Sequence, residues 1–156
     1  MQLEYFQLID RIRDLDTVAK TITVEAQVPT ASTIFEGHFP GYPLMPGVLL
    51  IESMAQTSGW LLLGLMKFER MPFLAAVKEA KIRGSVSPGE LLTIDANILH
   101  EGSGYAMTEA RVKVGGKLRC NATLTFSHVP FPSPDMRGYM DAMAKRIGFP
   151  QQVVLP

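Results

Sequence analysis

The feature that most constrains this chain of 156 residues is a long apolar run over residues 44–66. The run is long enough to raise the question of a membrane span. It contains polar side chains near its centre, among them Glu52, Gln56 and Thr57, and such groups are costly to place in lipid. A helix that is apolar on all sides is otherwise the central helix of a soluble fold. We therefore expect one buried helix over about residues 47–67 and no membrane span.

Most of the remaining chain has the pattern of antiparallel strands. The segments expected to form strands are residues 21–28, 73–77, 92–98, 105–114 and 117–126. The last two flank a Gly115-Gly116 turn that is typical of a hairpin, and Cys120 falls on the apolar side as a buried structural thiol. Residues 5–13 instead have a weak helical spacing. A sheet that wraps one apolar helix would bury that helix on most sides, so we expect an α+β fold.

The sequence changes character after residue 128. Prolines at positions 130, 132 and 134 end the last strand. Residues 135–147 then have the spacing of a short amphipathic helix, and the last residues are expected to form a tail. We expect one domain over residues 1–128 and a C-terminal extension over residues 129–156.

Composition and charge argue against several classes of function. Fifteen acidic and fifteen basic residues give a formal net charge of zero, so no global field favours nucleic acid. The first residues lack the basic segment and apolar core of a signal peptide, so a cytoplasmic protein is the default. The three histidines, His38, His100 and His128, have no metal-ligand spacing, and no metal site is expected.

One carboxylate stands between Glu36 and Lys67, and it is Glu52, within the apolar run. An acid among aliphatic side chains is costly unless it is protonated or paired. His38 lies fourteen residues earlier, in a loop rich in proline and aromatic residues. A lone acid and a histidine in this arrangement predict acid–base chemistry in a dry pocket, with a purely structural role as the alternative for each.

These two residues stand in short motifs. His-Phe-Pro occupies residues 38–40, Pro-x-Met-Pro-Gly-Val-Leu occupies residues 43–49, and Glu-x-x-Ala-Gln occupies residues 52–56. A weaker second block has Ala-Lys-Ile-Arg at residues 80–83 and Pro-Gly-Glu-Leu at residues 88–91. The motifs and their spacing closely resemble the signature of the β-hydroxyacyl-acyl-carrier-protein dehydratases of bacterial fatty-acid synthesis (FabZ type, FabA-like). With the strand pattern, the resemblance covers roughly residues 15–127.

The resemblance implies a hot-dog fold, in which a curled antiparallel sheet wraps a long central helix. It also implies a homodimer with composite active sites, the histidine from one subunit and the carboxylate from the other. Such dimers often assemble into hexamers. The partner would be an acyl carrier protein that carries the acyl chain on a phosphopantetheine arm. The reaction, which needs no cofactor, would convert a (3R)-hydroxyacyl thioester into the trans-2-enoyl thioester and water, in fatty-acid or lipid A acyl-chain biosynthesis.

The resemblance also assigns roles to the matched positions. His38 would be the base that removes the proton beside the thioester carbonyl, and Glu52 would donate or route a proton to the departing β-hydroxyl. The backbone N–H of Gly47, at the start of the helix, would bind the thioester oxygen on which negative charge develops. The candidates for lining an acyl tunnel, with core packing as the alternative for each, are Val48, Leu49, Ile51, Met54 and Trp60.

Two segments depart from the pattern of the relatives. Residues 5–12 keep only the Asp-Arg-hydrophobic end of the usual opening segment, and Gly84 stands where relatives often carry a second arginine. That second region tends to meet the carrier protein, so Lys81 and Arg83 are the candidates for this contact, with ordinary solvated charges as the alternative. The choice of carrier and the length of the acyl chain stay open.

Three alternative functions remain. A hot-dog thioesterase would hydrolyse the same kind of thioester. A dehydratase–isomerase would also move the double bond, but some of these relatives carry aspartate where Glu52 stands. A non-catalytic acyl-carrier-binding module would keep the fold without the reaction. The His-Phe-Pro motif and the glutamate favour the plain dehydratase.

Overall fold

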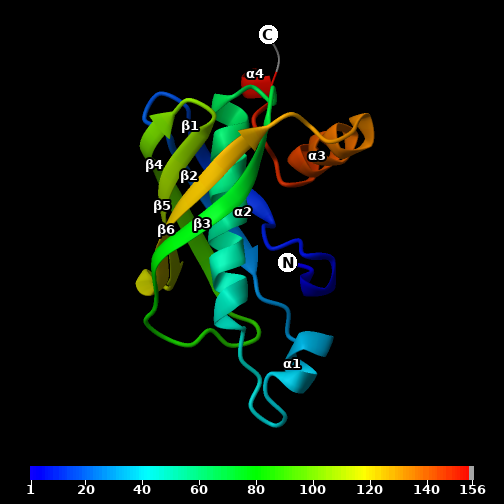
Figure 1. Ribbon diagram of the computed structural model, residues 1–156. Coiled ribbons are helices and arrows are strands. Elements are labelled where there is room, and N and C mark those ends of the chain that lie inside the picture. Colours follow the sequence, from blue (N-terminus) through cyan, green and yellow to red (C-terminus); the bar gives the residue numbers. More distant parts are fainter. Residues whose placement is uncertain (155–156) are drawn as a thin grey trace.

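One curled antiparallel sheet wraps a single long helix in the computed structural model, which describes residues 1–154 (Figure 1). The strands are β1 (Arg11–Asp16), β2 (Thr21–Gln27), β3 (Met71–Ile82), β4 (Leu91–Gly102), β5 (Tyr105–Val114) and β6 (Lys117–Val129). The helices are η1 (Leu3–Tyr5), α1 (Thr33–Gly37), α2 (Gly47–Leu65), α3 (Pro134–Arg146) and α4 (Gln151–Val154). The strands pair in the order β1-β2-β4-β5-β6-β3, so β1 and β3 are the edges. This confirms the expected α+β hot-dog fold, with α2 as its central helix.

Helix α2 has almost the bounds expected from the sequence, and its polar side chains find partners inside the fold. Ser53 Oγ donates to the Leu50 carbonyl at 2.7 Å, and Thr57 Oγ1 donates to the Ser53 carbonyl at 2.8 Å. By length and composition α2 could also cross a membrane, but most of it is buried under the sheet, as the core helices of globular proteins are. This helix is therefore weak evidence for a membrane span.

The strands bury the side chains that alternation predicted. In β6, Cys120, Ala122 and Leu124 are buried while the residues between them face outward. The β5–β6 hairpin turns at the two glycines, with Val114 paired to Lys117. Burial raises the pKa of the Cys120 thiol, which suits a structural residue and not a nucleophile.

The N-terminal segment differs from the sequence prediction, because β1 is an extended edge strand and the helical turn is limited to η1. Arg11 and Arg13 both form ion pairs with Glu25 on β2, each at 2.8 Å. The backbone N–H of Ile12 donates to the Ile147 carbonyl at 2.8 Å. These partners from distant parts of the chain favour an extended backbone and override a weak local spacing.

Strand β3 is longer than the five residues that the sequence predicted. It pairs with β6 on one side and forms the edge of the sheet on the other. Phe73, Leu74 and Val77 are exposed on this edge strand. A long and exposed edge strand whose first part is apolar is a surface on which another chain can pair.

The C-terminal extension packs on the rest of the fold. Helix α3 matches the helix expected over residues 135–147, and it lies beside α2 at the end of the molecule opposite α1 (Figure 1). Beyond it, Phe149 is buried and meets Phe68 edge to face, with ring centroids 5.2 Å apart. This stretch therefore lies closer to the core than a tail would, and residues 155–156 are outside the described part of the chain. The division of the chain at residue 128 stays a prediction.

Candidate active site

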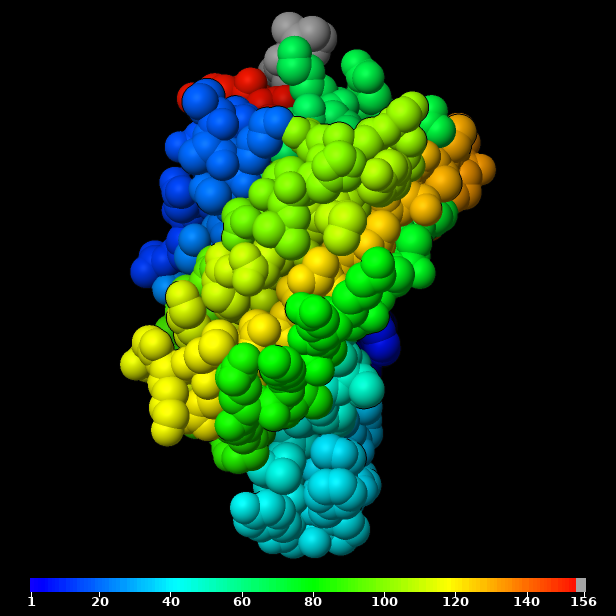
Figure 2. Space-filling model, turned by 60° about the vertical axis from the view of Figure 1, so that its left-hand side comes forward, coloured from blue at the N-terminus to red at the C-terminus, as the bar shows by residue number. Residues whose placement is uncertain are grey.

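His38 follows the short helix α1 directly. Its backbone N–H donates to the Ile34 carbonyl at 3.0 Å, and its carbonyl accepts from the Leu44 N–H at 2.9 Å. Its ring stacks on Phe39 with the centroids 4.0 Å apart. In Figure 2 this end of the molecule, coloured cyan, projects beyond the strands. The contacts hold the imidazole at the junction between α1 and the loop that leads to α2.

Hydrogen bonding defines the tautomer of the His38 ring. Nδ1 lies 3.1 Å from the Leu44 carbonyl oxygen. A carbonyl oxygen only accepts hydrogen bonds, so Nδ1 carries the proton. In the neutral ring, Nε2 then has a free lone pair, which a general base needs.

Helix α1, which carries His38, is tied to the start of the chain. Ser32 caps the helix by accepting from the Ile34 N–H at 3.1 Å. Glu4 accepts from the Ser32 hydroxyl at 2.6 Å and from the Thr33 backbone N–H at 3.0 Å. These hydrogen bonds, the one from Ser32 above all, lower the pKa of Glu4 to about 2. An ionised side chain near the N-terminus of the protein therefore holds the helix that positions the imidazole.

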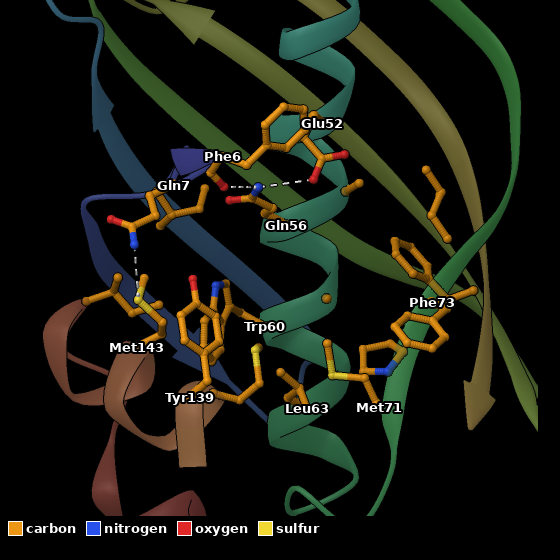
Figure 3. Close-up of a pocket in the computed structure, with 18 residues that line it drawn as sticks. Phe6, Gln7, Glu52, Gln56, Trp60, Leu63, Met71, Phe73, Tyr139 and Met143 are labelled. Carbon is orange, nitrogen blue, oxygen red and sulfur yellow. Dashed lines mark hydrogen bonds between the residues drawn. The ribbon is translucent and has the colours of Figure 1, made fainter. Parts of the chain in front are cut away.

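Glu52 lies on α2 and is fixed by the residue one helical turn later. Gln56 Nε2 donates to Glu52 Oε1 at 3.0 Å and to the Phe6 carbonyl at 2.8 Å (Figure 3). Gln56 Oε1 accepts from the Leu8 N–H at 3.1 Å, so the amide cannot turn over without losing bonds on both sides. Glu52 is only half-buried, which is less than the sequence predicted, because it lines an open cavity.

The cavity beside Glu52 has a volume of about 290 Å³ and follows one side of α2 (Figure 3). Its walls come from the N-terminal segment, α2, β3, β6 and α3. The lining residues are Phe6, Gln7, Ile9, Glu52, Ala55, Gln56, Gly59, Trp60, Leu63, Met71, Pro72, Phe73, Leu74, Phe126, Tyr139, Met140, Met143 and Ile147. A mostly apolar cavity with a few polar groups at one end suits an aliphatic chain with a reactive head.

His38 lines a second, more open pocket at the N-terminal end of α2, together with Gly47, Ile82 and Arg83. Five residues of helix separate Gly47 from Glu52, which is a rotation of about 140° around the helix axis. The two pockets therefore open on different sides of α2. Within the described part of one chain, His38 and Glu52 do not share a cavity.

The first N–H groups of α2 are open to a ligand. Pro46 supplies no side-chain cap, and within residues 1–154 the N–H groups of Gly47 and Val48 have no hydrogen-bond acceptor. Because Gly47 lines the His38 pocket, its N–H and the imidazole can meet one ligand. The side chain of Val48 is 70% exposed and lines neither pocket. Gly47 is thus well placed for the predicted role, whereas Val48 has no contact with either cavity.

The predicted carrier-contact residues lie at the end of β3, beside the His38 pocket. Lys81 and Arg83 are both exposed, and Arg83 lines that pocket. Within residues 1–154 neither forms an ion pair, whereas Arg11 and Arg13 on the other edge of the sheet are both paired with Glu25. Two positive charges that are unpaired in the described part of the chain, and that an acidic partner could meet, therefore stand next to the His38 pocket.

The predicted acyl-tunnel residues differ in where the structure places them. Trp60 lines the Glu52 cavity, whereas Leu49 and Met54 are buried in the core and Ile51 lines neither pocket. For those last three residues the core-packing alternative fits the structure better.

Sequence reasoning missed two contributions to the Glu52 cavity. The first is the donor Gln56, whose spacing of four residues from Glu52 is a signal for contact on one helix face. The second is α3, which brings Tyr139 and Met143 to the cavity. The amphipathic pattern of α3 shows that one face is covered, but it does not show by what.

Comparison with known proteins agrees with this geometry. Residues 1–123 match the family model described as a FabA-like domain, so the chain belongs to the FabA-like family. Within that family it is similar to the 3-hydroxyacyl-[acyl-carrier-protein] dehydratase FabZ of Levilactobacillus brevis, at 38% identity over 119 residues, or 76% of this chain and 80% of the relative. The FabZ dehydratase of Lactococcus lactis subsp. cremoris is 38% identical over 125 residues, or 78% of this chain and 84% of the relative. The expected kinship with FabZ-type dehydratases is confirmed.

Solved structures agree on the fold. The dehydratase heterocomplex ApeI:P from Xenorhabdus doucetiae matches with a TM-score of 0.64 at 16% identity, over 87% of this chain and 90% of that chain. A hypothetical thioesterase with coenzyme A from Streptococcus pneumoniae matches with a TM-score of 0.60 at 15% identity, over 77% and 85%. At these identities the likeness concerns the fold alone, and it includes both dehydratases and thioesterases.

Proposed function

We propose that this chain is a hydro-lyase that removes water from a (3R)-hydroxyacyl chain on acyl carrier protein and yields the trans-2-enoyl chain. The observation that carries the proposal is the His38 ring, which is fixed through Nδ1 and stands within a motif of the FabZ-type dehydratases. Its Nε2 lone pair and the open N–H of Gly47 belong to one pocket. A base and an oxyanion donor side by side are what proton removal next to a thioester requires.

The proposed reaction is the elimination of water from the hydroxyacyl chain. His38 Nε2 takes the proton from the carbon next to the thioester carbonyl, and Gly47 N–H stabilises the charge that builds on the carbonyl oxygen. The electron pair then forms the new carbon–carbon double bond as the bond to the β-hydroxyl breaks. Glu52 gives its proton to the leaving hydroxyl, which departs as water. Proton exchange from His38 back to Glu52 through solvent restores the enzyme, and no cofactor is consumed.

The active site of this proposal is composite, with His38 from one subunit and Glu52 from its partner. The separation of the two pockets within a chain supports this arrangement. The exposed apolar edge of β3 offers the surface for a homodimer, because a second β3 can pair with it and continue the sheet. Phe39 and Tyr42, exposed beside His38, would be covered in the same contact. Assembly into hexamers and a cytoplasmic location complete the proposal, and they are tested by light scattering and by cell fractionation.

A mixed dimer tests the composite site directly. His38→Ala and Glu52→Gln subunits carry different affinity tags, and the heterodimer is purified through both. If the site is composite, this heterodimer has one intact site, made of His38 from one subunit and Glu52 from the other, and recovers about half of the wild-type activity per dimer. Each homodimer of a single variant stays inactive. A heterodimer as inactive as both parents would contradict the composite site.

The carrier protein in this proposal docks beside the His38 pocket, on Lys81 and Arg83. Charge reversal at both positions should raise KM for a hydroxyacyl carrier protein and leave KM for the same acyl group on free pantetheine unchanged. Charge reversal at Arg11 and Arg13, which are already paired with Glu25, is the matched control. An equal rise in KM for both substrates would show that these residues act on the acyl group and not on the carrier.

The overall activity is tested with purified protein and (3R)-hydroxyacyl carrier proteins of several chain lengths. Mass spectrometry should show the loss of one water, abolished by His38→Ala and by Glu52→Gln. Release of a free acid would point to a thioesterase, and a cis-3 product would point to a dehydratase–isomerase. Tight binding of the acyl carrier protein without any product would favour a non-catalytic module.

A further inference from the structure

Helix α3, which lies beyond the 123 residues that match the family model, forms part of the wall of the Glu52 cavity. Tyr139, Met140 and Met143 line the cavity from α3. In Figure 3, Tyr139 and Met143 lie on the side of the cavity opposite Met71 and Phe73. A part of the chain that lies outside the match to the family model thus lines the cavity that holds the proposed acid.

The wall is fixed in place. Arg137 donates to the Phe68 carbonyl and lies over the rings of Phe68 and Phe131, 5.4 Å and 5.3 Å from their centroids. Met143 Sδ accepts from Gln7 Nε2 at 3.7 Å. Helix α3 is therefore bound both to the loop after α2 and to the N-terminal segment, and its apolar side chains face the cavity as a preformed surface.

The cavity has a polar end and an apolar end. Glu52 and Gln56 stand at one end, and Leu63 and Met71 stand at the other (Figure 3). The eleven residues from Glu52 to Leu63 correspond to a rise of about 16 Å along α2. A short acyl chain that reacts at Glu52 would fill only part of this length, whereas a long chain would extend along α2 towards Leu63 and Met71.

We propose that α3 is the distal wall of the acyl site and that Tyr139, Met140 and Met143 determine the preference for acyl chain length by binding the far part of a long chain. The inference rests on the proposed dehydration, since it places the reacting end of the chain at Glu52. Each of these side chains supplies apolar contact that a long chain gains and a short chain does not. They are specificity-determining residues and take no part in the chemistry.

Kinetics on two chain lengths test the inference. Tyr139→Ala and Met143→Ala should each lower kcat/KM about tenfold for a sixteen-carbon hydroxyacyl substrate, which is the size of effect expected when one or two buried methylene-sized contacts are lost. The same variants should leave kcat/KM for a four-carbon substrate unchanged. Met136→Ala is the matched control, because Met136 lies on the same helix but does not line the cavity. An unchanged or raised ratio of long-chain to short-chain kcat/KM in both variants would overturn the inference.

Binding gives a second readout that does not depend on turnover. Trp60 is the one tryptophan of the chain and lines the cavity, so its fluorescence reports an occupant. A non-hydrolysable pantetheine amide of a long acyl chain brominated near its end should quench Trp60 in the wild type and in Met136→Ala. Quenching should need about tenfold more ligand in Tyr139→Ala, whose side chain is half exposed and dispensable for the core.

The two experiments separate the inference from the proposed function. If quenching depends on Tyr139 but the protein forms no enoyl product, the proposed acyl-binding site is supported and the proposed dehydratase activity is refuted. Dehydration with the same chain-length profile in wild type, Tyr139→Ala and Met143→Ala would keep the dehydratase and refute the role of α3. Tyr139→Lys, which places a charge at the margin of the cavity, repeats the test with a substitution that leaves the buried core intact.

Discussion

Gln56 Nε2 donates a hydrogen bond to Glu52 Oε1 at 3.0 Å, one turn along the same helix. The amide is held by the Phe6 carbonyl at 2.8 Å and by the Leu8 N–H at 3.1 Å. Within residues 1–154, Oε1 is the Glu52 oxygen that accepts a hydrogen bond, so Oε2 is the one left to face the substrate. The N-terminal segment thus positions the proposed acid through a single amide.

Gln56→Ala should therefore lower kcat with little change in KM. Without the amide, the Glu52 carboxyl can rotate away from the leaving hydroxyl, and small misplacements of a catalytic group cost about tenfold to a hundredfold in rate. Steady-state kinetics with one hydroxyacyl carrier protein measure both constants. Gln151→Ala, at an exposed glutamine of α4, is the control and should leave both unchanged. A rise in KM at constant kcat would instead make Gln56 a residue that binds the acyl chain.

Gly47→Ala should impair activity without unfolding the protein. A methyl group at this position would overlap Ile82 Cδ1, the end of a side chain that is 55% exposed and can move. Both residues line the His38 pocket, so the adjustment falls on the space where the thioester oxygen binds. We expect kcat/KM to fall about a hundredfold, as for a displaced oxyanion donor.

Removing the overlap provides the check on that prediction. The double variant Gly47→Ala/Ile82→Ala should recover part of the lost kcat/KM, because it restores room in the pocket. Gly138→Ala, on α3, has open space around the added methyl group and should leave kcat/KM unchanged. A sharp drop in the melting temperature of Gly47→Ala, measured by circular dichroism, would show that the substitution acts on the fold and not on the site.

The sequence predicted the parts of this fold whose signals are local. A 19-residue helix that is apolar all round, the β5–β6 hairpin with its glycine turn, and the His38 and Glu52 motifs can each be read without knowing any neighbour. Strand β1 could not be predicted in this way, because Arg11 and Arg13 meet their common partner Glu25 only when β2 lies alongside. A weak helical spacing carries less energy than that pairing.

The catalytic residues of the candidate site could be predicted from the sequence, but the residues that form the walls of its cavity could not. His38 and Glu52 follow from motifs, but the tautomer of His38 depends on the Leu44 carbonyl, which the loop folds back onto the ring. Tyr139 reaches the Glu52 cavity because α3 is docked on distant segments, for example by Arg137 on Phe68, which lies 69 positions earlier. No local sequence pattern reveals contacts between distant segments. The proposed role of α3 in acyl chain-length preference could therefore not be predicted from the sequence.

Glu4→Gln should loosen the helix that carries His38, and the effect should depend on pH. The folded pKa of Glu4, about 2, lies below its ordinary value of 4.5, mainly because of the hydrogen bond from Ser32. A depressed carboxyl pKa stabilises the folded state above the ordinary value, and this contribution is lost as the pH falls from 4.5 towards 2. The difference in the free energy of unfolding between wild type and Glu4→Gln should therefore be full at pH 6 and mostly lost at pH 2.

Amide hydrogen exchange measures this locally. At pH 6 the Thr33 amide, which donates to Glu4, should exchange faster in Glu4→Gln than in the wild type. Glu36→Gln serves as the control, since Glu36 is an exposed glutamate of the same helix. Equal exchange of Thr33 in both proteins at pH 6 would mean that Glu4 does not hold α1.

The hydroxyls of Ser58 on α2 and Thr108 on β5 form a hydrogen bond of 2.8 Å between two fully buried side chains. Thr108→Val should destabilise the protein by about 1–3 kcal/mol, because it removes one partner and leaves the Ser58 hydroxyl in an apolar surrounding. The double variant Thr108→Val/Ser58→Ala should recover much of that loss, since no unpaired polar group is then left. Urea unfolding gives both values, with Thr123→Val on the outward face of β6 as the control. Additive losses in the double variant would mean that the two hydroxyls act independently, and that packing alone holds the helix bearing Glu52 against the sheet.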